Sequence, residues 1–261
     1  SSITYPFGPG TTMVMLVVKD NDGATDTSRA PVNRTAFRTS VNGPVYAGLS
    51  LLGDSLLYAV ATGDAVYRLD YNGNKVYNLQ VGGSVRSSSS ISFDTTVYIS
   101  SSDKNLYAFN KNGVPVWAPV PLGGELSATP TIDSLLNRIY IGVTNNNFFG
   151  LNRTTGAVDW SLFSDAPIKQ SAVLTSDRKL IFTTTKGTVY GIDLGAQAKP
   201  TGPTWTLLLG DTITSSPAID MNGNLYAGTY SGKLVKVSMQ KGKDAQIVWQ
   251  AQTGGTVYAA P

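Results

Sequence analysis

The four tryptophans of the chain lie in one periodic column, together with a phenylalanine and a tyrosine. The column runs at intervals of 40 to 45 residues through Phe37, Tyr77, Trp117, Trp160, Trp205 and Trp249. A period of this length indicates tandem structural repeats. Each repeat must bury its apolar face against a neighbouring repeat, because about 40 residues are too few to form an independent core.

Two further columns keep the same period. One is an aromatic residue in a β-rich run: Tyr58, Tyr98, Tyr140, Phe182 and Tyr226. The other is a branched apolar residue after a turn: Val45, Val85, Leu126, Ile168, Ile213 and Val257. Turn signals such as Asn112-Gly113 separate short runs with the alternation of β-strands, for example residues 105–109, and no helical periodicity is sustained. The pattern predicts an all-β propeller of four-stranded blades, with the aromatic columns packed between sheets.

Residues 106–109, 189–193 and 215–228 resemble the PQQ-like (pyrroloquinoline-quinone) repeat family. Segments that end in tryptophan, such as residues 113–117, are similar to the tryptophan docking motif of that family. The resemblance covers about residues 41–261 and implies a β-propeller. Many members of the family bind no quinone, so we expect no cofactor.

The ends of the chain favour a ring of six blades. Residues 256–261 match the start of a blade, and residues 3–5 are expected to supply its second strand, so that the N- and C-terminal strands pair. Residues 1–261 then form one propeller domain. As an alternative, residues 3–27 resemble the last strands of a PKD (polycystic-kidney-disease) domain, which makes residues 1–30 either part of the last blade or a remnant of such a domain.

The composition excludes several kinds of chemistry. The chain has no histidine and no cysteine, which removes histidine-based catalytic triads, thiolate nucleophiles and the common zinc sites. Its formal charge of +3 arises from scattered residues, so we expect no nucleic-acid partner. No apolar run reaches the length of a membrane span, about 20 residues. We predict that the protein is not an enzyme.

The sequence also contains weak candidates for a metal site and for glycosylation. Asp20, Asp22 and Asp26 have a spacing reminiscent of calcium loops, although a plain turn between strands is the favoured explanation. Asn33 and Asn152 begin Asn-x-Thr sequons, which are glycosylation candidates in a secreted protein.

The innermost strand of each blade carries the candidate ligand-binding residues. Directly after the branched column come Tyr46, Arg86, Ser127, Lys169, Thr214 and Tyr258. By strand alternation these side chains point toward the mouth of the central channel. We single out Tyr46, Arg86, Lys169 and Tyr258, since positive and aromatic groups there can hold an anionic or planar ligand; alternatively they form a solvated rim. Two residues later the positions are small, as a crowded axis requires: Gly48, Ser88, Thr129, Ser171, Ser216 and Ala260.

These features favour a non-catalytic extracellular, cell-surface or periplasmic scaffold. It would bind protein or glycan partners through the propeller faces and could assemble into a larger surface structure. One alternative is a quinoprotein dehydrogenase that uses PQQ. Another is a carbohydrate-binding propeller, with Phe148 and Phe149 among the aromatic residues that could stack on sugar rings.

Overall fold

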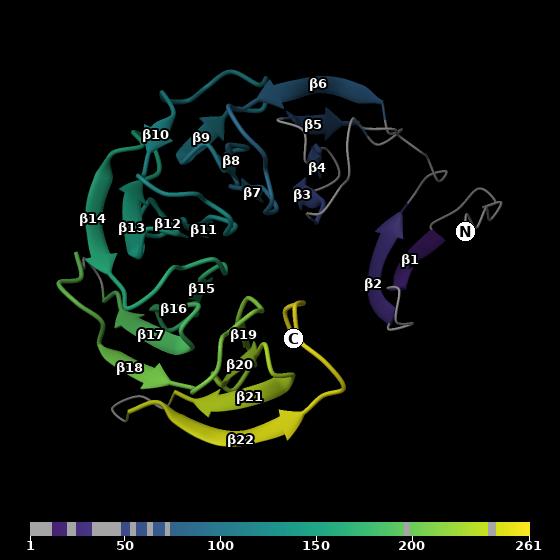
Figure 1. Cartoon of the computed structure of the whole chain (residues 1–261). Coiled ribbons are helices and arrows are strands. Elements are labelled where there is room, and N and C mark those ends of the chain that lie inside the picture. The colour runs from purple at the N-terminus through teal and green to yellow at the C-terminus, as the bar shows by residue number, and fades with distance from the viewer. Residues whose placement is uncertain are drawn as a thin grey trace.

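The computed structural model shows an all-β protein (Figure 1). It describes residues 12–19, 25–32, 48–52, 56–61, 65–70, 74–195, 199–239 and 244–261. Within these residues every regular element is a strand. The expected all-β fold is therefore confirmed.

Twenty of the strands form five antiparallel four-stranded sheets, each a meander in chain order. Four successive strands of one sheet fit the predicted blade. The strands are, sheet by sheet, β3 (Ser50–Leu52), β4 (Leu56–Ala61), β5 (Ala65–Leu69) and β6 (Lys75–Gln80); β7 (Ser90–Ile91), β8 (Val97–Ser100), β9 (Asn105–Phe109) and β10 (Val120–Pro121); β11 (Thr131–Asp133), β12 (Arg138–Gly142), β13 (Asn147–Asn152) and β14 (Val158–Phe163); β15 (Val173–Leu174), β16 (Lys179–Thr183), β17 (Thr188–Asp193) and β18 (Trp205–Leu208); β19 (Ala218–Ile219), β20 (Leu225–Gly228), β21 (Lys233–Ser238) and β22 (Gln246–Gln252).

The sheets are arranged radially, with the first strand of each near the axis and the fourth at the rim (Figure 1). First strands of neighbouring sheets contact one another, as β3 contacts β7 and β11 contacts β15. A two-stranded hairpin of β1 (Thr12–Lys19) and β2 (Thr25–Val32) lies in the remaining sector of the ring. The architecture is that of a β-propeller.

The apolar core lies between the sheets. Four residues of the branched column are almost inaccessible to solvent, namely Val85, Leu126, Ile168 and Ile213. Three of the aromatic column are equally buried, namely Tyr98, Tyr140 and Phe182. Each core cluster joins residues of two consecutive sheets; one, for example, unites Val66 of β5 with Ile99 of β8. Each blade therefore completes its core with the next blade, as the repeat predicted.

The column of tryptophans and tyrosines joins neighbouring blades near the rim of the propeller. Tyr77 in β6 donates a hydrogen bond through its hydroxyl to the carbonyl oxygen of Lys111 in the next blade, over 2.6 Å. Trp117 donates through Nε1 to the carbonyl oxygen of Arg153, one blade further, over 3.2 Å. In both junctions a glycine of that blade, Gly113 or Gly156, packs against the ring. The expected inter-blade role of this column is confirmed at these positions.

The ring closure expected at the chain ends stays a prediction. Val257 docks on the fifth sheet as a branched-column residue should, since its N–H donates to the carbonyl oxygen of Thr229 and its side chain covers Gly228. Residues 256–261 form no strand, and within the described residues no ladder joins them to β1 or β2. Residues 3–5, the expected partners, lie outside the described residues.

A glycine-to-alanine pair tests the rim junctions. Gly156 has φ of 74°, and an added Cβ would lie 2.8 Å from Cδ2 of Trp117. Gly156→Ala should lower the free energy of unfolding by about 2 kcal/mol, through left-handed backbone strain and overpacking. Gly202→Ala, where nothing lies within 4 Å of the added atom, should change it by less than about 0.5 kcal/mol. Equal effects in urea denaturation would contradict the docking role.

Candidate functional site

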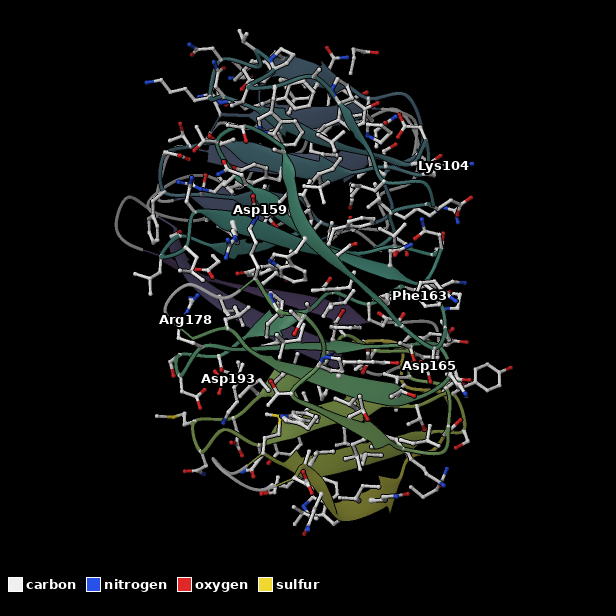
Figure 2. All side chains as sticks on the ribbon, turned by 90° about the vertical axis from the view of Figure 1, so that its left-hand side faces the viewer. Lys104, Asp159, Phe163, Asp165, Arg178 and Asp193 are labelled. Carbon is white, nitrogen blue, oxygen red and sulfur yellow. The ribbon has the colours of Figure 1, made fainter. Side chains whose placement is uncertain are left out.

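The meander gives the propeller two faces that differ in their connections. Face 1, as we call it, carries the turns between second and third strands and the connections between blades. Face 2 carries the turns between first and second strands and between third and fourth strands. Figure 2 shows the propeller from the side, with Lys104, Phe163 and Asp165 at face 1 and Arg178 and Asp193 at face 2.

The predicted channel-mouth residues that the structure describes lie on face 1. Arg86 and Lys169 are exposed, whereas their neighbours Val85 and Ile168 are buried, as strand alternation requires. Tyr258 is 70% exposed. Tyr46 lies outside the described residues. Three of the four are therefore exposed, while their orientation toward the channel mouth and ligand binding by them stay predictions.

The inner strands are joined around the axis by hydroxyl groups. The backbone N–H of Thr129 donates to Oγ of Ser171 over 2.9 Å, and the N–H of Ser171 donates to Oγ of Ser216 over 3.2 Å. Ser127 donates through Oγ to the carbonyl oxygen of Lys169 over 3.3 Å. Consecutive members of each predicted column are therefore neighbours. Arg86 and Lys169 are two blades apart, with the blade of Ser127 between them.

Face 1 carries a carboxylate that is held by hydrogen bonds, and it carries cations that form no ion pair within the described residues. Asp165 accepts hydrogen bonds from the hydroxyls of Thr184 and Thr188 at 2.9 and 2.6 Å. Burial opposes its ionisation, but these bonds and the charge of Lys186 outweigh it and lower the pKa of Asp165. Within the described residues, the cations of Arg86, Lys104 and Lys169 form no ion pair. Face 1 thus presents the exposed cations of Arg86, Lys104 and Lys169.

Face 2 presents apolar side chains at its inner turns. Phe93, Leu135 and Met221 occupy the turns between first and second strands of three sheets, and they are 88%, 77% and 105% exposed. Sequence reasoning missed these residues, since it followed only the periodic columns. The available signal was an apolar residue at a tight turn beside an aspartate, as in Phe93-Asp94 and Asp220-Met221.

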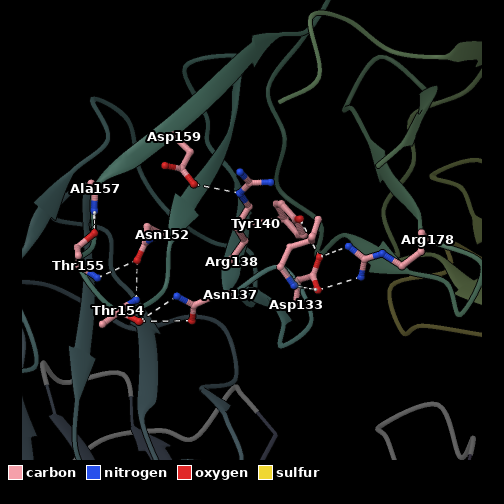
Figure 3. A network of polar contacts seen from close by, with 11 residues as sticks. Asp133, Asn137, Arg138, Tyr140, Asn152, Thr154, Thr155, Ala157, Asp159 and Arg178 are labelled. Carbon is pink, nitrogen blue, oxygen red and sulfur yellow. Dashed lines mark hydrogen bonds and ion pairs between the residues drawn. The ribbon is translucent and has the colours of Figure 1, made fainter. Parts of the chain in front are cut away.

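The corresponding turn of the fourth sheet is charged and ties two blades together (Figure 3). Nη1 and Nη2 of Arg178 donate to the two carboxylate oxygens of Asp133 at 2.9 and 2.6 Å. Tyr140 also donates to Asp133 through its hydroxyl, over 2.9 Å. The Asp133 side chain is only 1% exposed, and burial opposes its ionisation. The hydrogen bonds from Arg178, the Leu136 N–H and Tyr140 outweigh burial and lower the pKa of Asp133.

Other polar groups of face 2 are also held in structural contacts. Arg138 donates to Asp159 over 3.0 Å, and Arg153 pairs with Asp94 of the preceding blade over 2.8 Å. The sequon residue Asn152 ends β13, and its Oδ1 accepts from the N–H groups of Thr154 and Thr155 in the turn that follows (Figure 3). Use of this sequon, and of Asn33 outside the described residues, stays a prediction.

The structure corrects one aromatic candidate and leaves the metal candidate open. Phe148 cannot stack on a sugar, because it is fully buried and stacks on Phe182 with ring centroids 4.1 Å apart. Phe149 is half-buried. Asp20 and Asp22 lie outside the described residues, and the Asp26 side chain is not described. Among the residues that the structure does describe, no group of three or more carboxylates could hold a metal ion.

Five four-stranded sheets, arranged radially around one axis, define a β-propeller repeat protein. A family model described as outer membrane protein assembly factor BamB matches residues 14–198 and 94–261. The chain belongs to this family, which confirms the PQQ-like repeat. The matches include β1 from residue 14 onward and β2; the PKD resemblance of residues 1–30 stays a prediction. No helix in the described part of the chain could cross a membrane.

Solved structures confirm the fold. BamB from Moraxella catarrhalis is 18% identical with a TM-score of 0.68, over 86% of this chain and 66% of that one. A computationally designed protein, Ika8, is 13% identical with a TM-score of 0.74, over 94% of this chain and 74% of that one. The chain thus spans just under two thirds of the length of the Moraxella protein. No curated protein matches.

The buried pair of Asp133 and Arg178 predicts an acid-sensitive contribution to stability. The folded pKa of Asp133 is depressed, so its contribution is present above the unfolded pKa of about 3.9 and is lost as pH falls through the folded pKa. In urea denaturation between about pH 7 and about pH 2, Asp133→Asn should lose part of the acid-dependent decrease in stability. Arg178→Ala should lower the free energy of unfolding at neutral pH by about 3 kcal/mol, because it leaves a buried carboxylate unpaired. An unchanged acid slope in Asp133→Asn would contradict this assignment.

Proposed function

We propose that the protein is a non-catalytic scaffold that binds a protein partner through face 2. Its place of action would be the periplasm, the outer membrane or the cell surface. Membership of a family named for outer membrane protein assembly supports a role in holding proteins together. The fold suits such a role, since rigid blades present short turns in fixed positions around an axis.

The exposed apolar turns carry this proposal. Phe93, Leu135 and Met221 project from three sheets at the same point of the repeat, and each is almost wholly exposed. Large apolar side chains exposed on one face of a protein support an interaction site there. Protein interfaces combine such apolar anchors with a polar rim. Here the nearby pairs Arg153–Asp94 and Arg178–Asp133 supply ordered polar groups.

The absence of an enzymatic role is part of the same proposal. Most carboxylates of the described sheets accept hydrogen bonds within turns or form hydrogen bonds and ion pairs between blades. Asp220, for instance, accepts from the side-chain amide and N–H of Asn224, which lower its pKa to about 2. A carboxylate held ionised in a turn is a poor general acid near neutral pH. A quinoprotein reaction would need a ligand set for calcium and quinone that these residues do not form.

Site-specific crosslinking tests face 2. The chain has no cysteine, so a single introduced cysteine can carry a maleimide photocrosslinker without side reactions. Leu135→Cys on face 2 is matched by Phe163→Cys on face 1, because the native side chains are 77% and 74% exposed. Incubated with an envelope extract of the source cells, the Leu135→Cys protein should form a discrete adduct with one protein, and the Phe163→Cys protein should not. The adduct should diminish when Phe93→Ser is added, since an apolar anchor is lost.

Adducts of equal yield from both faces, or none from Leu135→Cys, would contradict the proposal. A separate titration addresses the quinoprotein alternative. Calorimetry with PQQ, with and without calcium, should give no binding heat. Calcium-dependent binding at micromolar PQQ or tighter would instead direct attention to Arg86, Lys169 and Tyr258 on face 1.

A further inference from the structure

The fourth strand of the fifth sheet is an unprotected sheet edge. β22 lies at the rim of the propeller (Figure 1), where the outer side of every fourth strand faces solvent. Within the described residues, β22 pairs only with β21. We propose that two copies of this chain associate edge to edge through β22. This proposal is independent of face 2.

The other rim strands carry features that discourage pairing. β6 contains Lys75 and β14 contains Asp159, and a charge on an edge strand opposes the approach of another strand. β10 has two residues, one of them Pro121, and β18 has four. Shortness and proline are further protections of this kind. β22 has seven residues, Gln-Ile-Val-Trp-Gln-Ala-Gln, with no charge and no proline.

The side chains of β22 are also accessible. All seven residues are exposed, including Val248 at 53% and Trp249 at 39%. β6, β14 and β22 each have a β-bulge in their pairing with the third strand of their sheet, so a bulge does not distinguish β22. What distinguishes β22 is an uncharged, apolar and long edge.

The backbone of β22 has free donors on its outer side. The N–H of Thr253, directly after the strand, donates inward to the carbonyl oxygen of Gly232 over 2.7 Å. N–H groups alternate in direction along a strand, so those of Gln250 and Gln252 point away from β21. These groups are available to a strand that adds to the edge.

The absence of charge on β22 favours a second copy of this chain as the partner that adds to the edge. A two-fold interface places the same surface on both sides, so any charge on the strand would lie near its like. β22 has none, whereas Lys75 of β6 would be repelled by its own copy in such an arrangement. The area of one strand pair is well below that of a standard interface, about 1,600 Å², which predicts reversible and weak association.

A matched pair of lysine substitutions tests the proposal. Val248 and Val76 directly precede the column aromatics Trp249 and Tyr77, and they are 53% and 49% exposed. Sedimentation equilibrium of the whole chain, from about 10 µM to about 1 mM, covers the range expected for small interfaces. The native chain should dimerise reversibly. Val248→Lys should weaken the dimer at least about tenfold, and Val76→Lys, on an edge that already has a lysine, should not.

Gln250→Pro provides a second variant, because it removes an outward N–H without an inward hydrogen bond, and it should also weaken the dimer. Circular dichroism of each variant must show a native spectrum and melting transition. A native chain that stays monomeric over the whole range would overturn the proposal. Equal weakening by Val76→Lys and Val248→Lys would overturn it as well, because the contact would then not be specific to β22.

Discussion

The packing of one blade against the next is the interaction on which the rest of the structure depends. A single four-stranded sheet of about 40 residues has two apolar faces and cannot bury either alone. Ile168 shows how the chain solves this problem: it belongs to the connection that begins the fourth sheet, yet its side chain covers Gly142 at the end of β12 in the third. Its N–H donates to the carbonyl oxygen of Val143. Val257 repeats this contact on Gly228.

The same dependence explains why functional groups are confined to the two faces and the rim. Side chains within the sheets are committed to neighbouring blades, and even polar ones are used in this way, as Asp133 and Arg178 illustrate. Some turn residues, by contrast, have no such partners. Face 1 consequently displays cations such as Arg86 and Lys169, and face 2 displays Phe93, Leu135 and Met221.

The fold could be predicted from the sequence because its determinants recur. Trp117, Leu126 and Tyr140 are single examples of positions that recur along the chain, and they pack between blades. The blade architecture, the burial of the branched column and the exposure of Arg86 and Lys169 follow from period and alternation alone.

The site was less predictable because exposure at turns is decided by contacts that do not follow the period. Phe148 and Phe93 are both aromatic, but one stacks in the core on Phe182 and the other projects from a turn. The ion pair of Arg178 with Asp133 joins residues 45 positions apart, and no sequence motif predicts it. The edge of β22 becomes evident only when its length and charge are compared with those of the other rim strands.

Hydrogen–deuterium exchange of the whole chain tests most directly the claim that blades are stabilised by their neighbours. The second strands β8, β12 and β16 pair with the first and third strands of their own sheets, and nearly all their residues are buried, so their amides should exchange most slowly. The turns that contain Phe93, Leu135 and Met221 should exchange within seconds to minutes. Slow exchange in those turns, or uniform exchange across second strands and turns alike, would contradict the account.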